Sequence, residues 1–161
     1  MCGIAGLIHR GKSSNVGEEL QNMLQALKHR GPDSTGYALY ANNDGQNFIL
    51  RFKVGENVGE GSTSVNEDES VYDERKKIVD KKLSDLGAPI VKEEKLTPYS
   101  YRYEIRYDKD LMEFSKAIES IESVEILSIG KSLELIKDLG DAKAVSERYG
   151  LNKVQGTHGI G

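Results

Sequence analysis

This sequence of 161 residues has few of the side chains that form disulfides or hold metals. Its single cysteine, Cys2, excludes an internal disulfide and a cysteine-rich zinc site. Its histidines, His9, His29 and His158, are scattered, and no two of them share the i, i+4 spacing that places ligands on one helical face. We therefore expect no metal site, and we expect the cysteine to stay reduced.

The sequence also lacks long apolar runs and an excess of basic charge. No segment approaches the roughly 20 apolar residues that a membrane-spanning helix needs, and the apolar run at residues 4–8 is too short for the core of a signal peptide. The net charge of −4, with 22 basic and 26 acidic residues and no basic block, disfavours nucleic acid as a partner. We expect a cytoplasmic protein of one-domain length, with no membrane partner.

A helix is predicted near the amino terminus. Asn15 and Glu18 have the spacing of an N-cap and a capping acid. The helix should end near His29, because Gly31-Pro32 follows and proline disfavours helical geometry in the residue before it. Its apolar residues recur on one helical face at Val16, Leu20, Met23, Leu24 and Leu27.

Three strands are predicted around this helix, at residues 3–8, 35–40 and 47–54. The last two should form a hairpin, because residues 42–45 end in an Asp-Gly pair that favours this turn. The Gly-, Ser-, Asn- and acid-rich residues 55–69 then predict a mobile excursion.

A second α+β unit is predicted after the excursion. Its helices should end at Gly87 and Gly150, and Asp110 should complement the start of a third helix. We place an inserted subdomain at residues 56–152, between two parts of a main domain at 1–55 and 153–161. The expected elements are helices at 72–86, 111–121 and 142–149, strands at 89–93 and 99–107, and a hairpin of 124–129 with 132–137.

One strand of the insertion carries a stripe of tyrosines. Tyr99, Tyr101, Tyr103 and Tyr107 alternate with charged residues, so they share one face of the strand. Aromatic residues on a sheet can stack RNA bases. The alternative is that the stripe packs against a helix, for which the helix at 111–121 is the candidate.

The start Met1-Cys2-Gly3 is the first candidate for chemistry. A small residue after Met1 allows the methionine to be removed, which gives Cys2 a free α-amine next to its thiol. With unperturbed pKa values of about 8 for the amine and about 8.5 for the thiol, the amine can act as the base for the thiol. The alternative is a small buried core residue, which is the common role of a lone cysteine.

The second candidate is the octet His29-Arg30-Gly31-Pro32-Asp33-Ser34-Thr35-Gly36. It predicts a rigid loop, because the proline fixes one φ angle and charged or hydroxyl groups stand at nearly every other position. The alternative is a plain turn from helix to strand, in which Arg30 and Asp33 are solvated or paired.

Together, the two motifs resemble the class II glutamine amidotransferase domain of the N-terminal nucleophile hydrolases. The family's Cys-Gly-Ile-x-Gly start is matched by Cys2, Gly3, Ile4 and Gly6, and its His-Arg-Gly-Pro-Asp loop by residues 29–33. The continuation after Asp33 is similar to the glutamate-synthase-like branch. The resemblance implies part of a four-layer αββα fold carrying the inserted α+β subdomain.

The resemblance also implies a function. Cys2 would be the nucleophile that hydrolyses L-glutamine through a thioester, and Arg30, Gly31, Pro32 and Asp33 would shape the substrate pocket. A synthase subunit or domain would accept the ammonia. The glutaminase reaction would need no cofactor in this chain, and any FMN or iron–sulfur cluster would belong to the partner.

The family's motifs also predict an incomplete site. Its His-x-Arg segment, its Asn-Gly pair and its acidic reader of the substrate amine are expected downstream of Gly161. Because the loss of one oxyanion donor costs about 10²–10³ in rate, we expect almost no activity from this chain alone. The alternative function is a truncated homologue that acts as an interaction or regulatory module.

Overall fold

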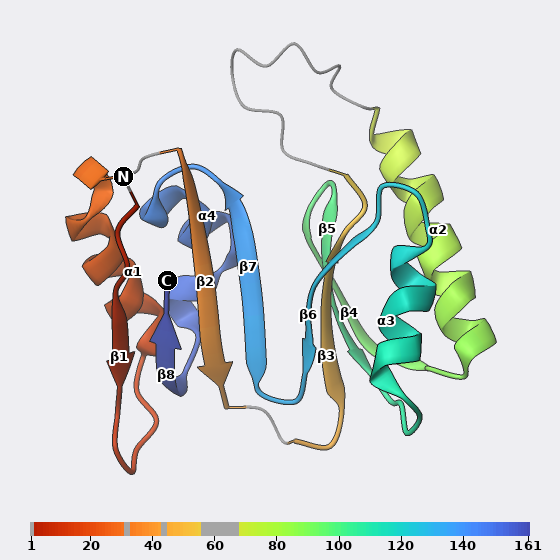
Figure 1. Ribbon diagram of the computed structural model, residues 1–161, viewed down its shortest axis with the longest axis horizontal. Helices are drawn as coiled ribbons and strands as arrows, with labels where there is room; N and C mark the ends of the chain where they lie inside the picture. The colour runs from red at the N-terminus through yellow and green to blue at the C-terminus, as the bar shows by residue number, and fades with distance from the viewer. Residues whose placement is uncertain (1, 31–32, 43–44, 56–67) are drawn as a thin grey trace. The chain divides into compact units, whose positions relative to one another are not determined.

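The computed structural model describes most of the chain (Figure 1). The described residues are 2–30, 33–42, 45–55 and 68–161. The expectations for Gly31 and Pro32, for the centre of the turn at 42–45 and for most of the excursion at 55–69 therefore lie outside the described residues. The rest confirms a mixed α+β protein.

The chain forms two compact units, Met1–Gly45 with Gly130–Gly161, and Gln46–Ile129. These limits differ from the boundaries expected from the sequence, after residues 55 and 152. The difference follows from strand pairing. The strand after residue 46 pairs within the second unit, and the strand after residue 130 pairs within the first.

The first unit contains a sheet of four strands in the order β1-β8-β2-β7. Its pairs are all antiparallel. The predicted amino-terminal strand is present but shorter than expected, and the strand predicted at 35–40 is confirmed. The strands are β1 (Gly6–Ile8), β8 (Gly156–Ile160), β2 (Ser34–Ala41) and β7 (Leu133–Leu139).

Helices cover one face of this sheet, as Figure 1 shows for α1 and α4. The face is apolar because Tyr37, Leu39 and Ile136 are each at most 1% exposed. The Tyr37 hydroxyl donates a hydrogen bond of 2.7 Å to the carbonyl oxygen of Ala142, the first residue of α4. The helical segments are α1 (Val16–Ala26), η1 (Lys28–Arg30), α4 (Ala142–Tyr149) and η2 (Leu151–Lys153).

The predicted periodicity of α1 is confirmed, but its predicted cap is not. Val16, Leu20 and Leu24 are buried, whereas Met23 is 40% exposed. Asn15 is the N-cap residue, yet its side chain caps no backbone N–H. Instead its Nδ2 donates to Glu18 Oε2 at 2.7 Å, and its buried Oδ1, the atom that would cap the helix, has no hydrogen-bond partner among the described residues.

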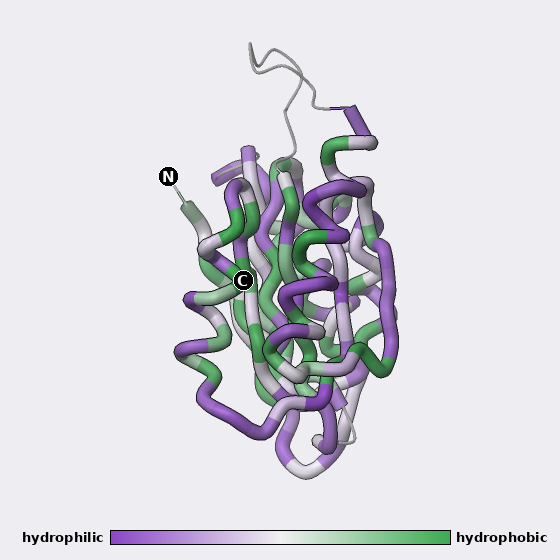
Figure 2. Tube along the Cα trace, turned by 90° about the vertical axis from the view of Figure 1, so that its right-hand side faces the viewer, coloured by the Kyte–Doolittle hydropathy of each residue, from purple (hydrophilic) through white to green (hydrophobic). Residues whose placement is uncertain are grey.

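The second unit contains a sheet in the order β4-β5-β3-β6, with α2 (Glu69–Leu86) and α3 (Leu111–Glu119) packed on it. In Figure 2, hydrophobic stretches recur along the strands. The helices predicted here begin and end close to the expected residues. The strands are β4 (Ile90–Thr97), β5 (Ser100–Ile105), β3 (Phe48–Lys53) and β6 (Glu125–Gly130).

The tyrosine stripe lies inside the core of the second unit. Tyr99, Tyr101 and Tyr103 are at most 8% exposed and belong to one cluster with residues of β3, α2 and α3. Such rings cannot stack nucleic-acid bases, so the RNA-binding interpretation is wrong. The helix-packing alternative is confirmed, although α2 shares this role with α3.

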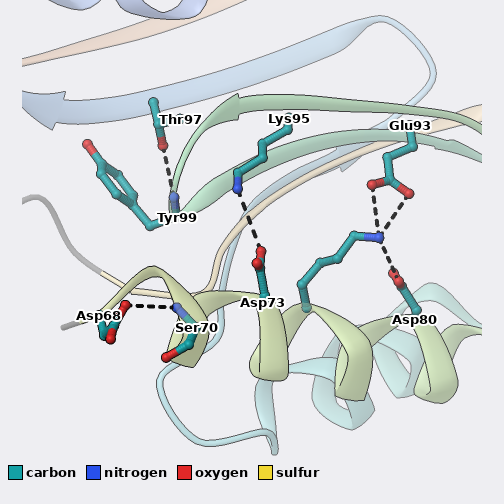
Figure 3. Close-up of polar contacts among 9 residues, drawn as sticks. Asp68, Ser70, Asp73, Asp80, Glu93, Lys95, Thr97 and Tyr99 are labelled. Carbon is teal, nitrogen blue, oxygen red and sulfur yellow. Dashed lines mark hydrogen bonds and ion pairs between the residues drawn. The ribbon is translucent and has the colours of Figure 1, made fainter.

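Ion pairs join α2 to the neighbouring strand β4. Lys76 Nζ lies 2.9 Å from a carboxylate oxygen of Glu93 on β4, and 2.8 Å from a carboxylate oxygen of Asp80 on its own helix (Figure 3). Lys95 Nζ on β4 lies 3.6 Å from a carboxylate oxygen of Asp73 on α2. These side chains are partly exposed, so each pair contributes little, typically about 0.2–1 kcal/mol. The buried tyrosine core is therefore the main source of stability in this unit.

The predicted helix ends are confirmed. Asp110 accepts hydrogen bonds from the N–H groups of Met112 and Glu113, and Gly87 and Gly150 end α2 and α4 with left-handed φ angles of 74° and 65°. Within the described part of the chain, no helix is long and apolar enough to cross a membrane.

Both predicted hairpins are wrong. β3 pairs with β5 and not with β2, although only a short segment separates β2 from β3. β6 likewise lies next to β3 while β7 pairs with β2. In both cases the turn residues favoured a hairpin between consecutive strands, but the second strand joins the other sheet instead.

Candidate functional site

A pocket of about 190 Å³ lies in the first unit, where both sequence motifs meet. Five segments line it: the amino-terminal residues, the end of α1 with η1, the start of β2, the start of α4, and Gly161 just after β8. Its polar or reactive side chains are Cys2, Lys28, Asp33, Ser34, Thr35 and Asp141. Leu24 and Leu27 provide an apolar wall on the α1 side.

Cys2 is exposed and lines this pocket. The interpretation of Cys2 as a buried core residue is therefore wrong. The segment that carries it is held beside the end of β8, because Ala5 and Gly161 exchange two backbone hydrogen bonds of 2.9 Å. This pairing fixes the strand only three residues beyond the thiol.

Close backbone packing supports the floor of the pocket. A Cβ atom at Gly161 would lie 2.6 Å from the Gly36 carbonyl oxygen and 2.6 Å from Leu24 Cδ1. At distances below 3.0 Å a neighbouring atom must shift, and the Gly36 carbonyl oxygen belongs to the backbone of β2, which cannot shift as easily as a side-chain end. Glycine at this position therefore lets the end of β8 approach both β2 and α1.

The loop after α1 is only partly within the described residues. Asp33 is exposed and lines the pocket with Cys2, whereas Arg30 is not among the described lining residues. A Cβ atom at Gly3 would lie 3.7 Å from Arg30 Cβ, so the base of the Arg30 side chain packs next to the segment that carries Cys2. Gly31 and Pro32 lie outside the described residues.

Sequence reasoning missed two charged residues of the pocket, Lys28 and Asp141. Their side chains form an ion pair of 2.6 Å. Asp141 is also the N-cap of α4 and accepts a hydrogen bond of 2.9 Å from the Ala144 N–H. The Lys28 ammonium, together with the Ala144 N–H, lowers the pKa of the Asp141 carboxyl below its usual value. A capping residue before the helix at 142–149 was a usable signal, but its pairing with Lys28 was not visible in the sequence.

The histidines lie elsewhere in the structure. His9 Nε2 is 2.9 Å from a carboxylate oxygen of Glu19, and the His158 ring stacks on Tyr40 at 3.8 Å between ring centroids. None of the described residues that line the pocket is a histidine. Among the described residues, no group of three or more His, Cys, Asp or Glu side chains is arranged to hold a metal.

This arrangement suits nucleophilic chemistry on a small polar molecule. An exposed thiol faces a pocket that carries one ammonium, two carboxylates and two hydroxyl groups. A thiol attacks electrophilic carbonyl carbon once a base takes its proton.

Comparison with known proteins agrees with this geometry. Residues 1–50 match the glutamine amidotransferase domain family. A protein of Methanothermobacter thermautotrophicus, provisionally named a glutamine amidotransferase, is 32% identical over 170 residues, which cover all of this chain and 50% of that protein. The first 50 residues are therefore glutamine amidotransferase-like, and they contain both Cys2 and the loop that carries Asp33.

Two further relatives carry related names. The glutamine amidotransferase-like protein GlxB of Rhizobium meliloti is 27% identical over 163 residues, which cover all of this chain and 48% of GlxB. A protein of Methanocaldococcus jannaschii, provisionally named a glutamine-hydrolysing asparagine synthetase, is 50% identical over 40 residues, which are 25% of this chain and 8% of that protein. The chain spans about half the length of the first two relatives.

Proposed function

We propose that this chain is the amino-terminal part of a class II glutamine amidotransferase, an N-terminal nucleophile hydrolase of the glutamate-synthase-like branch. The observation that carries the proposal is that one pocket holds Cys2 from the first motif and Asp33 from the second. The match of residues 1–50 to the glutamine amidotransferase domain supports it.

In this proposal the reaction begins when Met1 is removed and Cys2 becomes the terminal residue. The Cys2 α-amine accepts the thiol proton, and the thiolate attacks the side-chain amide carbon of L-glutamine. The tetrahedral intermediate collapses with a proton transferred to the leaving nitrogen, which departs as ammonia and leaves a γ-glutamyl thioester. Water then attacks the thioester carbon, which releases glutamate and regenerates the thiol.

The loop after α1 would shape the glutamine pocket through Arg30, Gly31, Pro32 and Asp33. Asp33 lines the pocket, so its role is at the substrate side. The base of Arg30 packs beside Gly3, so it organises the loop rather than reacting.

The ammonia would pass to a synthase subunit or domain in the cytoplasm, and glutamate synthesis is the leading candidate for its use. A thiol and an amine suffice for the hydrolysis, so this step would need no metal or organic cofactor. Any FMN or iron–sulfur cluster would belong to the partner that consumes the ammonia.

The test is glutamate release from glutamine by the product extended to the length of the relatives, measured together with its intact mass. We expect loss of Met1, and we expect activity to disappear both in Cys2→Ser and in a variant whose Met1 is retained. Asn22→Ala, an exposed change on α1, serves as the control and should behave as the unmodified protein. Unchanged hydrolysis by Cys2→Ser would refute the assignment of the nucleophile.

The alternative is a non-catalytic module, and the reading frame decides between the two. We expect that the 161-residue chain alone is inactive, and that a product extended to the length of the relatives contains the His-x-Arg, Asn-Gly and acidic motifs and hydrolyses glutamine. If the extended product has these motifs and still shows no Cys2-dependent hydrolysis, the module is the better interpretation.

A further inference from the structure

The two residues before α4 contact both sides of the loop that carries the second motif. On one side, Asp141 pairs with Lys28 at 2.6 Å, at the start of η1. On the other side, the Gly140 N–H donates to the Asp33 carbonyl oxygen at 3.0 Å, and Thr35 Oγ1 donates to the Gly140 carbonyl oxygen at 2.8 Å. The dipeptide Gly140-Asp141 therefore holds the described residues that come before and after Gly31-Pro32.

A second contact joins the end of α1 to the start of α4. Gln25 Oε1, one turn before Lys28, accepts a hydrogen bond of 3.1 Å from the Lys143 N–H in the first turn of α4. That amide is one of the helix N–H groups that have no partner within the helix. The carboxyl-terminal end of α1 is thus attached to the start of α4 at two points.

The identity of each residue fits this role. Asp141 performs two tasks, because one carboxylate oxygen caps Ala144 and the other accepts from Lys28. Gly140 has a φ angle of 116°, a backbone conformation that favours glycine, and its two backbone groups contact Asp33, just before β2, and Thr35 in β2. The Lys28 side chain is 50% exposed, so its contact with Asp141 contributes little to overall stability.

We propose that the Lys28–Asp141 ion pair, with Gly140 beside it, positions the second motif relative to Cys2. This inference rests on the proposed glutaminase function. Lys28 and Asp141 act here as positioning residues, because they hold the start of η1 and the start of β2 at the distance that the pocket requires. Their effect on the reaction passes through Asp33 and the loop rather than through a transferred proton.

The experiment uses variants that remove the charges and keep the local structure. Lys28→Met keeps the aliphatic stem, and Asp141→Asn keeps a side chain that caps helices well. Glu147→Gln is the matched control, because it breaks an exposed ion pair with Lys143 on the same helix, away from the pocket. Lys28→Arg tests whether a retained charge restores the wild-type behaviour.

Three readouts are measured on the product that shows Cys2-dependent glutaminase activity. We expect kcat/KM to fall roughly tenfold to a hundredfold in Lys28→Met and in Asp141→Asn, because a misplacement of about 1 Å can cost about 10²-fold. The double variant should be no worse than either single variant, because both remove the same contact. Hydrogen exchange in the peptide that covers residues 33–41 should be faster in both, with only a small change in the thermal midpoint at neutral pH, because the pair is exposed.

The outcomes separate this inference from the proposed function. Unchanged kcat/KM and unchanged exchange in both variants, with an active wild type, would overturn the positioning role and leave the function intact. Additive losses in the double variant would also overturn it, because they would show that the two residues act independently. Absence of any Cys2-dependent hydrolysis in the wild type would overturn both.

Discussion

Replacing Gly17 by alanine tests how closely α1 packs in the first unit. Gly17 is the second residue of α1, and the ordinary expectation is that alanine stabilises a helix by about 1 kcal/mol relative to glycine. In this structure a Cβ atom at Gly17 would lie 1.8 Å from the carbonyl oxygen of Leu151. An ordinary contact is 3.4–4 Å, so α1 and η2 would have to separate by well over 1 Å.

The packing effect should outweigh the helix propensity. Leu151 is fully buried, and the Gly17 N–H donates to the Val154 carbonyl oxygen at 3.2 Å, so the η2 segment has no free direction in which to move. Overpacking of this kind costs about 1–3 kcal/mol and occasionally more. Because the 1.8 Å approach is so close, the cost should lie at the upper end of this range, about 3 kcal/mol, and the propensity gain of about 1 kcal/mol leaves a net loss of about 2 kcal/mol in the free energy of unfolding.

Urea denaturation measures this difference. Asn22→Ala is the control, because Asn22 is exposed on the same helix and should gain a few tenths of a kcal/mol from propensity alone. Leu24, Leu27 and Lys28 follow Gly17 along the chain and line the pocket beside Cys2, so a displaced α1 would open the pocket wall. We therefore also expect faster alkylation of Cys2 by iodoacetamide in Gly17→Ala. Equal or higher stability of Gly17→Ala would refute the reasoning.

Two further predictions use paired variants. Tyr103→Phe should lower the free energy of unfolding by about 1 kcal/mol, because the Tyr103 hydroxyl donates to Asp80 at 2.9 Å. Tyr101→Phe should be neutral or stabilising, because the buried Tyr101 hydroxyl has no partner in the described part of the chain. Thermal unfolding distinguishes the two variants. The lowered pKa of Asp141 gives the first unit stability that is fully present above the unfolded pKa of about 3.9 and is lost as the pH falls through the lower folded pKa. Melting curves across roughly pH 2 to 6 should therefore show a weaker acid dependence in Lys28→Met, and an identical dependence would count against the ion pair.

Features set by neighbouring residues could be predicted from the sequence. The apolar face of α1 repeats within one or two turns, and the caps at Asp110, Gly87 and Gly150 depend only on the adjacent backbone. These signals are local because a helix satisfies its hydrogen bonds within its own segment. The same reasoning failed at Asn15, whose side-chain amide donates to the Glu18 carboxylate and does not cap the helix.

Strand partners could not be predicted in this way. The turn at residues 42–45 has the composition of a hairpin, yet β3 joins β5, where Leu50 and Phe52 lie opposite Tyr103 and Tyr101. This register places large apolar side chains on one face and buries them under α2 and α3. Burial of that face outweighs a local turn preference, and nothing within the turn itself reveals it.

Some residues of the candidate site could likewise be predicted from the sequence, and others could not. Cys2 and Asp33 were identified because each belongs to a short continuous motif that the family shares, and the structure places both at one pocket. Lys28 and Asp141 were missed because only the antiparallel pairing of β2 with β7 brings the start of α4 to the end of α1. A residue that contributes to a site through tertiary contact alone leaves no spacing signal in the chain.

The strength of the contacts along α4 indicates how the pocket is maintained. Asp138 at the end of β7 is 4% exposed and accepts hydrogen bonds of 2.9 Å from Arg148 and from the Tyr149 hydroxyl. Hydrogen bonds to a charged group such as this buried carboxylate typically contribute about 1.5–3 kcal/mol each, whereas an exposed pair such as Lys28–Asp141 contributes about 0–1 kcal/mol. The buried contact therefore fixes α4 on the sheet, and the exposed contact uses that fixed helix as a reference for the loop. Asp138→Ala should consequently unfold the first unit at lower temperature, while Asp141→Asn should alter the reaction and change the melting temperature at neutral pH only slightly.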